Sequence, residues 1–326
     1  MIDLHLHLDG SLPPALLLKL AKEEGVRLPA QSAQELVPFL TAPKTCGSLN
    51  EYLEKFSLPV SCMQSETTLA EAAEGLVQEL AQQGLCYAEI RFAPQLHRQK
   101  GLGQRQVVSA VIGGIRTALK KQPQIQIGLL LCCMRGADNH EENLETIRLV
   151  AEFYGDIVCG ADLAGAEALF PTRDFSREFA LASAYHLPFT IHAGEAAGPE
   201  SIRAALDLGA KRIGHGVRVI EDPALLNEIR ERQIPLEVCL TSNMQTKALG
   251  EGTVHPLLEL LRKGVKVTVN TDNMTVSGTT IAHEFACLKE MGMTAQEEQE
   301  LLLNAADAAF LEEEKKEKLR ESILSR

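Results

Sequence analysis

Residues 125–162 read IQIGLLLCCMRGADNHEENLETIRLVAEFYGDIVCGAD, and they contain one full unit of the pattern that determines the fold. Segments 125–132 and 156–162 are short and apolar, which indicates two buried strands. Between them, the apolar residues of 143–154 recur at spacings of three and four, as on one face of an amphipathic helix. A strand, a helix and a second strand in this order are typical of parallel strands joined by a crossover helix.

The same alternation continues along the chain of 326 residues. Strand-like segments lie at 1–6, 86–92, 125–132, 156–162, 187–192, 211–215, 234–239 and 265–270. Helical spacing occurs between most of them, for example at 69–83, 143–154 and 256–263. Eight parallel strands in a chain of this length favour a closed (β/α)8 TIM barrel of the α/β class over an open doubly wound sheet, although spacing alone leaves both open. We expect residues 1–326 to form a single barrel domain.

Two segments stand outside this regular pattern. The interval between the first two strands, roughly residues 7 to 85, is too long for one crossover and contains several helical patterns. We interpret residues of about 44–62 within it as a helical lid inserted after the first strand. Residues 311–326 are charged throughout and predict a solvated terminal helix.

Composition excludes several classes of protein. Lys and Arg number 32 against 44 Asp and Glu, a net charge of −12, which disfavours a nucleic-acid polymer as partner. The eight cysteines form no C-x-x-C pair and are interpreted as reduced, mostly buried thiols. No apolar run approaches the roughly 18 residues that span a membrane, and no secretory signal opens the sequence. We expect a cytoplasmic protein without membrane contact.

Histidines and carboxylates gather where the predicted strands end. His5 and His7 are two residues apart, so on a strand both side chains face the same side. His192 and His215 end two later strands, and Asp272 follows the last. The carboxyl ends of the strands are where barrel enzymes place catalysis. Imidazole nitrogens together with a carboxylate suit zinc better than magnesium or calcium.

Glu195 follows His192 across a glycine-containing turn, close to the metal without being a ligand, and is the best general acid/base candidate. The alternative is a surface glutamate that begins a helix, because Ala196–Pro199 resembles a helix entry. His215 lies between two glycines and could be either a catalyst or a turn residue. The sequence contains no dinucleotide-binding turn, P-loop, serine nucleophile elbow or cysteine-ligated deaminase motif.

Taken together, these motifs resemble those of the adenosine deaminase family, from residue 1 to about residue 310. The matching motifs are MIDLHLHLDGS at 1–11, YAEIRFAP at 87–94, GADLAG at 160–165, HAGE at 192–195, GHG at 214–216, TSN at 241–243 and NTDN at 270–273. The resemblance implies one zinc ion per chain bound by His5, His7, His192 and Asp272. It implies that zinc-activated hydroxide replaces the 6-amino group of a purine nucleoside, with Glu195, His215 and Asp272 as catalytic residues.

The resemblance also implies the substrate contacts. Gly165 would offer its N–H to the purine, Asp9 would bind the ribose 5′-hydroxyl, and His7 would lie beside the substrate. Asn273 departs from the aspartate of the animal enzymes, but its amide can donate to purine N7 at any pH. AMP-directed relatives carry asparagine and adenine-directed relatives carry glutamate where this chain has Asp9, so the resemblance favours adenosine and 2′-deoxyadenosine.

Three alternatives remain open at this point. The chain could be an adenine deaminase or a deaminase of N6-substituted AMP, because these share the zinc site and differ around the sugar. It could be another metal hydrolase on the same barrel, since fold does not fix function. It could also be a non-catalytic member that keeps a structural metal, although such a protein would need neither Glu195 nor His215. The oligomeric state is not predicted.

Overall fold

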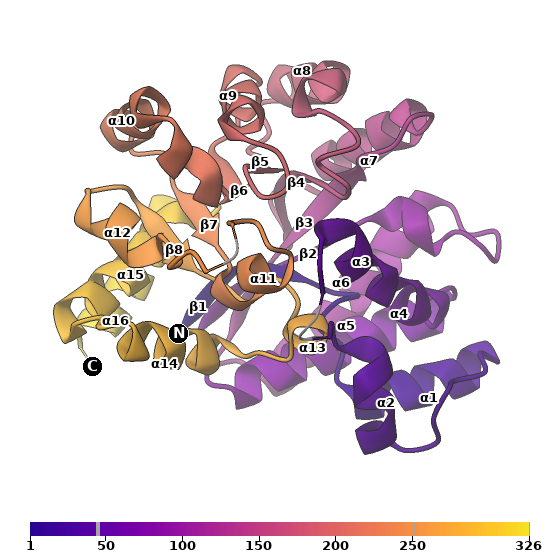
Figure 1. The fold of residues 1–326 in the computed structure, drawn as a ribbon. Helices are drawn as coiled ribbons and strands as arrows, with labels where there is room; N and C mark the ends of the chain where they lie inside the picture. Colours follow the sequence, from indigo (N-terminus) through magenta and orange to yellow (C-terminus); the bar gives the residue numbers. More distant parts are fainter. Residues whose placement is uncertain (44–45, 251, 326) are drawn as a thin grey trace.

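The computed structural model describes residues 1–43, 46–250 and 252–325. The described residues contain eight strands, distributed along the chain from residue 2 to residue 269 (Figure 1). They are β1 (Ile2–His7), β2 (Tyr87–Phe92), β3 (Gln126–Met134), β4 (Val158–Ala164), β5 (Thr190–Ala193), β6 (Arg212–His215), β7 (Leu236–Val238) and β8 (Val267–Val269). Each lies within a few residues of a predicted strand, so the predicted order of strands is confirmed.

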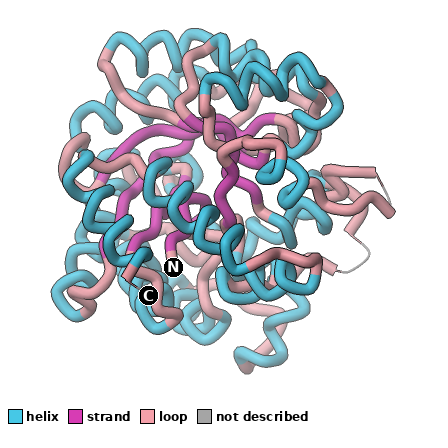
Figure 2. The backbone as a smooth tube through the Cα atoms, turned by 90° about the vertical axis from the view of Figure 1, so that its left-hand side faces the viewer, coloured by secondary structure: helices cyan, strands magenta, loops and turns pink. Residues whose placement is uncertain are grey.

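All strand pairs are parallel, in the orders β1-β2-β3-β4 and β5-β6-β7-β8. The two four-stranded sheets meet at both edges. The N–H of Ala161 in β4 donates to the carbonyl of Pro188 just before β5, and Leu6 in β1 pairs with Asp272 after β8. Figure 2 shows the strands in the interior with helices around them. The predicted (β/α)8 barrel is therefore the observed architecture.

Helices alternate with the strands and cover the outside of the barrel (Figures 1 and 2). The α-helices are α1 (Pro14–Glu24), α2 (Ala33–Leu40), α3 (Leu49–Leu53), α4 (Ser57–Ser61), α5 (Glu66–Gln82), α6 (Gln104–Lys121), α7 (His140–Phe153), α8 (Ser176–Ala184), α9 (Pro199–Asp207), α10 (Pro223–Arg232), α11 (Leu240–Gln245), α12 (Leu257–Arg262), α13 (Met274–Ser277), α14 (Ile281–Glu290), α15 (Ala295–Ala308) and α16 (Glu313–Leu324). The 3-10 helices are η1 (Glu54–Phe56), η2 (Pro94–His97), η3 (Thr172–Phe175) and η4 (Val217–Glu221).

Helix α5 illustrates how local sequence sets these elements. Ser65 and Thr68 form a capping box at its start, which satisfies backbone N–H groups that the first turn leaves free. Its buried face packs on α6 at Gly114, where an added Cβ would lie 2.0 Å from the carbonyl oxygen of Ala70. Only glycine permits the two helices to approach this closely.

The barrel interior contains buried charges as well as apolar side chains. Arg91 donates to Asp162 and to Glu237, both at 2.9 Å, and Arg212 donates to Glu237 at 2.6 Å and also bonds Glu89. All five side chains are buried, and buried charges are tolerated when they are paired in this way. The network lies on β2, β4, β6 and β7, in direct contact with the histidine-bearing ends of the strands.

The segment predicted as a lid contains short helices. Residues 49–61 form α3, η1 and α4, whereas residues 44 and 45, its first two, lie outside the described residues. Tyr52 is buried, and its hydroxyl is 2.6 Å from that of Ser277. We retain the lid function of this segment, and the single-domain description of residues 1–326, as proposals.

The C-terminal helix differs in part from its prediction. Residues 313–324 form α16, but Leu319 and Ile323 are buried against α15 and β1 rather than solvated. Two apolar residues at a spacing of four are enough to attach an otherwise charged helix. All eight cysteines are free, and no helix in the described part of the chain has the length and apolarity needed to cross a membrane.

Candidate metal and catalytic site

The polar residues that the sequence analysis identified meet at the carboxyl ends of the strands. His5 and His7 lie on β1, His192 on β5, and His215 ends β6. Asp272 follows β8, where its N–H donates to the carbonyl of His5 and its carbonyl accepts from the N–H of His7, each at 2.7 Å. These two bonds attach the end of β8 to β1.

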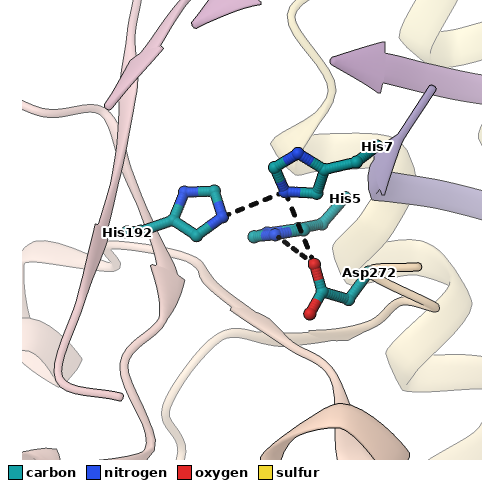
Figure 3. Close-up of side chains that lie close together, drawn as sticks. All are labelled: His5, His7, His192 and Asp272. Carbon is teal, nitrogen blue, oxygen red and sulfur yellow. Dashed lines mark hydrogen bonds and ion pairs between the residues drawn. The ribbon is translucent and has the colours of Figure 1, made fainter. Parts of the chain in front are cut away.

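Three imidazoles and one carboxylate converge on one point (Figure 3). One potential ligand atom from each of His5, His7, His192 and Asp272 lies within 4.8 Å of the others. The Nε2 atoms of His7 and His192 are 3.2 Å apart, and Oδ1 of Asp272 is 3.4 Å from Nε2 of His5 and of His7. Tetrahedral ligands at about 2.0–2.1 Å from a zinc ion would be separated by roughly 3.3 Å. The spacing therefore fits one small cation.

Two carboxylates orient the imidazoles of His5 and His192 for metal binding. Nδ1 of His5 is 2.8 Å from Oε2 of Glu237, and Nδ1 of His192 is 3.1 Å from Asp162. Each Nδ1 can thus carry the hydrogen and donate it, which leaves the Nε2 lone pair facing the shared point. Nε2 of His5 is buried and has no hydrogen-bond partner in the part of the chain that the structure describes, as expected for an atom that binds a metal.

The electrostatics favour metal binding at His7, His192 and Asp272. At His5, burial and the charge of Arg91 oppose protonation, but the contacts with Asp272 and Glu237 raise the pKa of the ring. Burial, the largest cause, lowers the pKa values of His7 and His192, so both rings are neutral and can act as ligands. Burial opposes ionisation of Asp272, yet its 3.4 Å contact with Nε2 of His5 and the nearby histidines hold the pKa of this carboxyl below its usual range. A neutral imidazole and an ionised carboxylate are the forms that coordinate metals.

Two of these residues have unusual backbones. Asp272 and His215 both have φ of +60°, in the left-handed region that residues other than glycine rarely adopt. Such conformations cost free energy and concentrate at functional sites. Gly214 and Gly216 flank His215, and a Cβ at Gly214 would lie 3.1 Å from the Cα of His192, so these small residues allow the strand ends to come together.

Glu195 lies beside the histidine cluster. It is 4% exposed, and α9 begins only at Pro199, so Glu195 is not a surface residue at the start of a helix. Its Oε1 accepts from Thr246 at 2.8 Å, and its Oε2 is 3.4 Å from Nε2 of His215. Burial, followed by the charge of Asp272, raises the pKa of Glu195 to about 8. Its two polar contacts come from the ends of β6 and α11.

Asn243 fixes the orientation of His215. Nδ2 of Asn243 is 3.0 Å from Nδ1 of His215, and because an amide nitrogen only donates, Nδ1 accepts and Nε2 carries the hydrogen of the neutral ring. Burial keeps the pKa of His215 well below its usual value. A second set of close ligand atoms combines His215 and Asp272 with Cys239, but burial raises the pKa of the Cys239 thiol and disfavours the thiolate that binds metals.

A pocket of about 330 Å³ opens onto the cluster, which is within the size range of small-molecule sites. One wall comes from the lid segment, with Leu49, Tyr52, Leu53 and Phe56. The polar lining is formed by His7, Asp9, Arg135, His192, Glu195, His215, Asp272 and Asn273. A larger cavity of about 640 Å³ lies near the amino ends of β2 to β4 and contains none of the site histidines.

The predicted substrate-binding residues line this same pocket. Asp9 is 5% exposed, and burial raises its pKa to about 6. Gly165 has φ of +106°, a conformation that favours glycine. Asn273 packs so closely on Gly10 that an added Cβ there would lie 1.8 Å from its Oδ1. The structure thus brings together all the site residues predicted from the sequence, while their individual roles stay predictions.

Sequence reasoning missed the residues that support the site. Asp162, Glu237, Ser242, Asn243 and Thr246 all hydrogen-bond a predicted catalytic or metal-binding side chain. Asp162 falls in the GADLAG motif and Ser242 and Asn243 in TSN, so those motifs carried a signal. Nothing in the sequence indicated Glu237 or Thr246.

The chain matches the family model described as adenosine deaminase over residues 1–326. It is 48% identical to an adenosine deaminase of Haemophilus ducreyi, over 100% of this chain and 96% of that protein. Its fold is similar to that of an adenine deaminase from Arthrobacter aurescens, with a TM-score of 0.90, 28% identity and coverage of 99% and 98% of the two chains. An N6-mAMP deaminase of Arabidopsis gives a TM-score of 0.87 at 29% identity, covering 100% and 97%. With a family match over its whole length, this chain belongs to the adenosine deaminase family.

Proposed function

We propose that this protein hydrolytically deaminates adenosine, and also 2′-deoxyadenosine, to the 6-oxo nucleoside and ammonia. One observation carries the proposal: the ligand atoms of His5, His7, His192 and Asp272 converge beside a pocket that is also lined by Glu195, a buried glutamate whose pKa is about 8. A metal site beside a carboxyl that remains protonated at neutral pH is the arrangement required to activate water and to protonate a ring nitrogen as the water attacks.

Zinc is the metal that the donor set favours. Three imidazole nitrogens and one carboxylate oxygen are the ligands typical of zinc, whereas calcium and magnesium prefer oxygen. Zinc bound there would lower the pKa of a water ligand to roughly 7 and so supply the nucleophile at neutral pH.

The protein's own residues would manage the protons. Glu195, protonated below about pH 8, would donate its proton to purine N1 as C6 is attacked. Protonation of N1 withdraws electron density from C6 and makes this carbon more electrophilic. His215 donates through Nε2 and orients the attacking oxygen, since Asn243 occupies its Nδ1. Asp272, which the nearby histidines hold ionised before the reaction, would accept the proton of the attacking oxygen and pass it to the leaving amine.

The remaining pocket residues would recognise the nucleoside. The N–H of Gly165 and the amide of Asn273 face the purine, with Asn273 donating to N7. Asp9 accepts from the ribose 5′-hydroxyl and repels a 5′-phosphate, a like-charge contact that costs several kcal/mol. The lid segment, through Leu49, Leu53 and Phe56, covers the apolar side of the pocket.

Two alternative substrates follow from the family. An adenine deaminase and an N6-mAMP deaminase have closely similar folds, so fold alone does not choose among adenine, adenosine and modified AMP. The buried carboxylate of Asp9 favours an uncharged sugar with a free hydroxyl.

The experiment is a spectrophotometric assay with adenosine, which loses its ultraviolet band on deamination, using the wild type and Glu195→Gln. We expect turnover by the wild type and a kcat lower by about 100-fold or more in the variant, with unchanged zinc content. Loss of zinc from the variant would make Glu195 a ligand, and full activity would exclude it as the proton donor.

A further inference from the structure

Glu167 is a buried carboxylate that the proposed reaction does not use. It follows β4 by three residues and is 2% exposed. Its Oε1 accepts from the N–H of Gly194 at 2.7 Å, and its Oε2 accepts from the N–H groups of Glu195, Ala196 and Ala197 at 3.0, 2.7 and 2.9 Å. One side chain thus binds four consecutive backbone donors, and these donors surround the proposed proton donor.

These four N–H groups have no other acceptor within residues 1–43, 46–250 and 252–325. The segment cannot satisfy them by itself, because Gly194 has φ of +73° and α9 begins only at Pro199. A buried N–H without a partner costs about 1–3 kcal/mol, so the conformation of 194–197 depends on an acceptor from elsewhere in the chain. An ionised carboxylate is suited to this because both oxygens only accept.

Glu167 also joins two parts of the pocket. It lies two residues after Gly165, which lines the pocket where the purine is expected, and it holds the turn that carries Glu195. Its charge is one of the causes that raise the pKa of Glu195, after burial and Asp272. The side chain itself is not among the residues that line the pocket, so it acts on the reaction only through the backbone and the field at Glu195.

We propose that Glu167 is a positioning residue, whose carboxylate fixes the backbone of residues 194–197 and thereby places the Glu195 carboxyl for proton transfer to the purine bound beside Gly165. This inference rests on the proposed role of Glu195. A small displacement of such a group suffices to slow the reaction, since about 1 Å can cost on the order of 100-fold.

The test is Glu167→Gln, which keeps the shape but replaces one accepting oxygen with an NH2 group that must face backbone donors. We expect kcat for adenosine, expressed per bound zinc, to fall by about 10- to 100-fold while KM changes by less than about threefold. The matched control is Glu24→Gln. Glu24 is also buried and accepts from a backbone N–H, that of Gln64, but it lies in α1 and lines no part of the pocket. The control should lose thermal stability and keep its kcat.

A double-mutant cycle separates positioning from general stabilisation. If Glu167 acts through Glu195, then Glu167→Gln should lower the kcat of the Glu195→Gln protein by less than about twofold. An unchanged kcat in the single variant, or a loss that multiplies in full with that of Glu195→Gln, would overturn the proposal. Should Glu167→Gln fail to fold, Glu167→Asp, which keeps the charge but not the reach, is judged by the same criteria. A Glu195→Gln protein of normal kcat would instead refute the role of Glu195 itself.

Discussion

The hydroxyl of Thr246 donates a 2.8 Å hydrogen bond to Oε1 of Glu195, and both side chains are buried. This bond stabilises the ionised form of Glu195, so it lowers a pKa that burial and Asp272 otherwise raise. The balance of these effects gives a pKa of about 8. A carboxyl with this value is protonated through the neutral range and loses its proton as the pH rises further.

The pH dependence of catalysis follows from that balance. Because Glu195 is active in its protonated form, kcat/KM for adenosine should fall as the pH rises through about 8. Thr246→Val removes the bond that lowers the pKa, so the descending limb should move to higher pH. Profiles of kcat/KM for both proteins between pH 5 and 10 test this expectation. If the descending limb of the Thr246→Val profile lies at the same pH as in the wild type, or at a lower pH, the assignment of Glu195 as the acid is contradicted.

Metal removal should abolish activity. The ligand atoms of His5, His7, His192 and Asp272 offer one site for a cation, and prolonged chelation should empty it. We expect zinc to restore the activity and to raise the melting temperature, because an ion that binds only the folded state stabilises that state. Metal content, activity and melting temperature are measured on the same samples. Full activity in metal-free protein would refute the site.

Asp162, whose carboxylate contacts Nδ1 of His192, should increase the affinity of the site for its metal. Asp162→Asn weakens the 3.1 Å contact to Nδ1 of His192 and leaves Arg91 with less compensation. Loss of such a partner weakens metal binding by about 10- to 100-fold, which competition with a chelator measures. Glu178→Gln is a matched control, because Glu178 is a buried carboxylate that is 2.6 Å from Nδ1 of His140, a histidine outside the site. Equal zinc affinity in the Asp162 variant and the control would show that the contact between Asp162 and His192 does not contribute to metal binding.

Asp9 should select for nucleosides. Asp9→Asn removes the negative charge but keeps a polar group of similar size. We therefore expect kcat/KM for adenosine to fall and the ratio of kcat/KM for adenosine to that for AMP to decrease. If Asp9 only braces the backbone, through the 3.2 Å bond from the N–H of Gly10, all substrates should lose activity alike. The ratio of kcat/KM for adenosine to that for AMP, measured on both proteins, distinguishes the two roles.

The sequence predicted what depends on local patterns. Apolar segments separated by amphipathic helices located all eight strands, and polar residues at the strand ends located the cluster around His5 and Asp272. It did not predict Glu237, whose partner His5 is 232 positions away, because no local pattern marks which charge meets which across a barrel. The role of Glu167 was not predicted for the same reason, since the N–H groups that it binds lie in a turn 27 to 30 residues later. The burial of α16 depended on only two apolar residues among charged neighbours.

The comparison of substrates tests the central claim most directly. Initial rates of formation of the 6-oxo product are measured by ultraviolet absorbance with adenosine, adenine, AMP and N6-methyl-AMP on the zinc-loaded wild type at one pH near neutrality. Asp9 repels the phosphate of the two nucleotides and finds no 5′-hydroxyl in adenine, so kcat/KM for adenosine should exceed that for each of the other three by about 100-fold or more, equivalent to roughly 2.7 kcal/mol. A higher value for adenine or for either nucleotide would contradict the assignment.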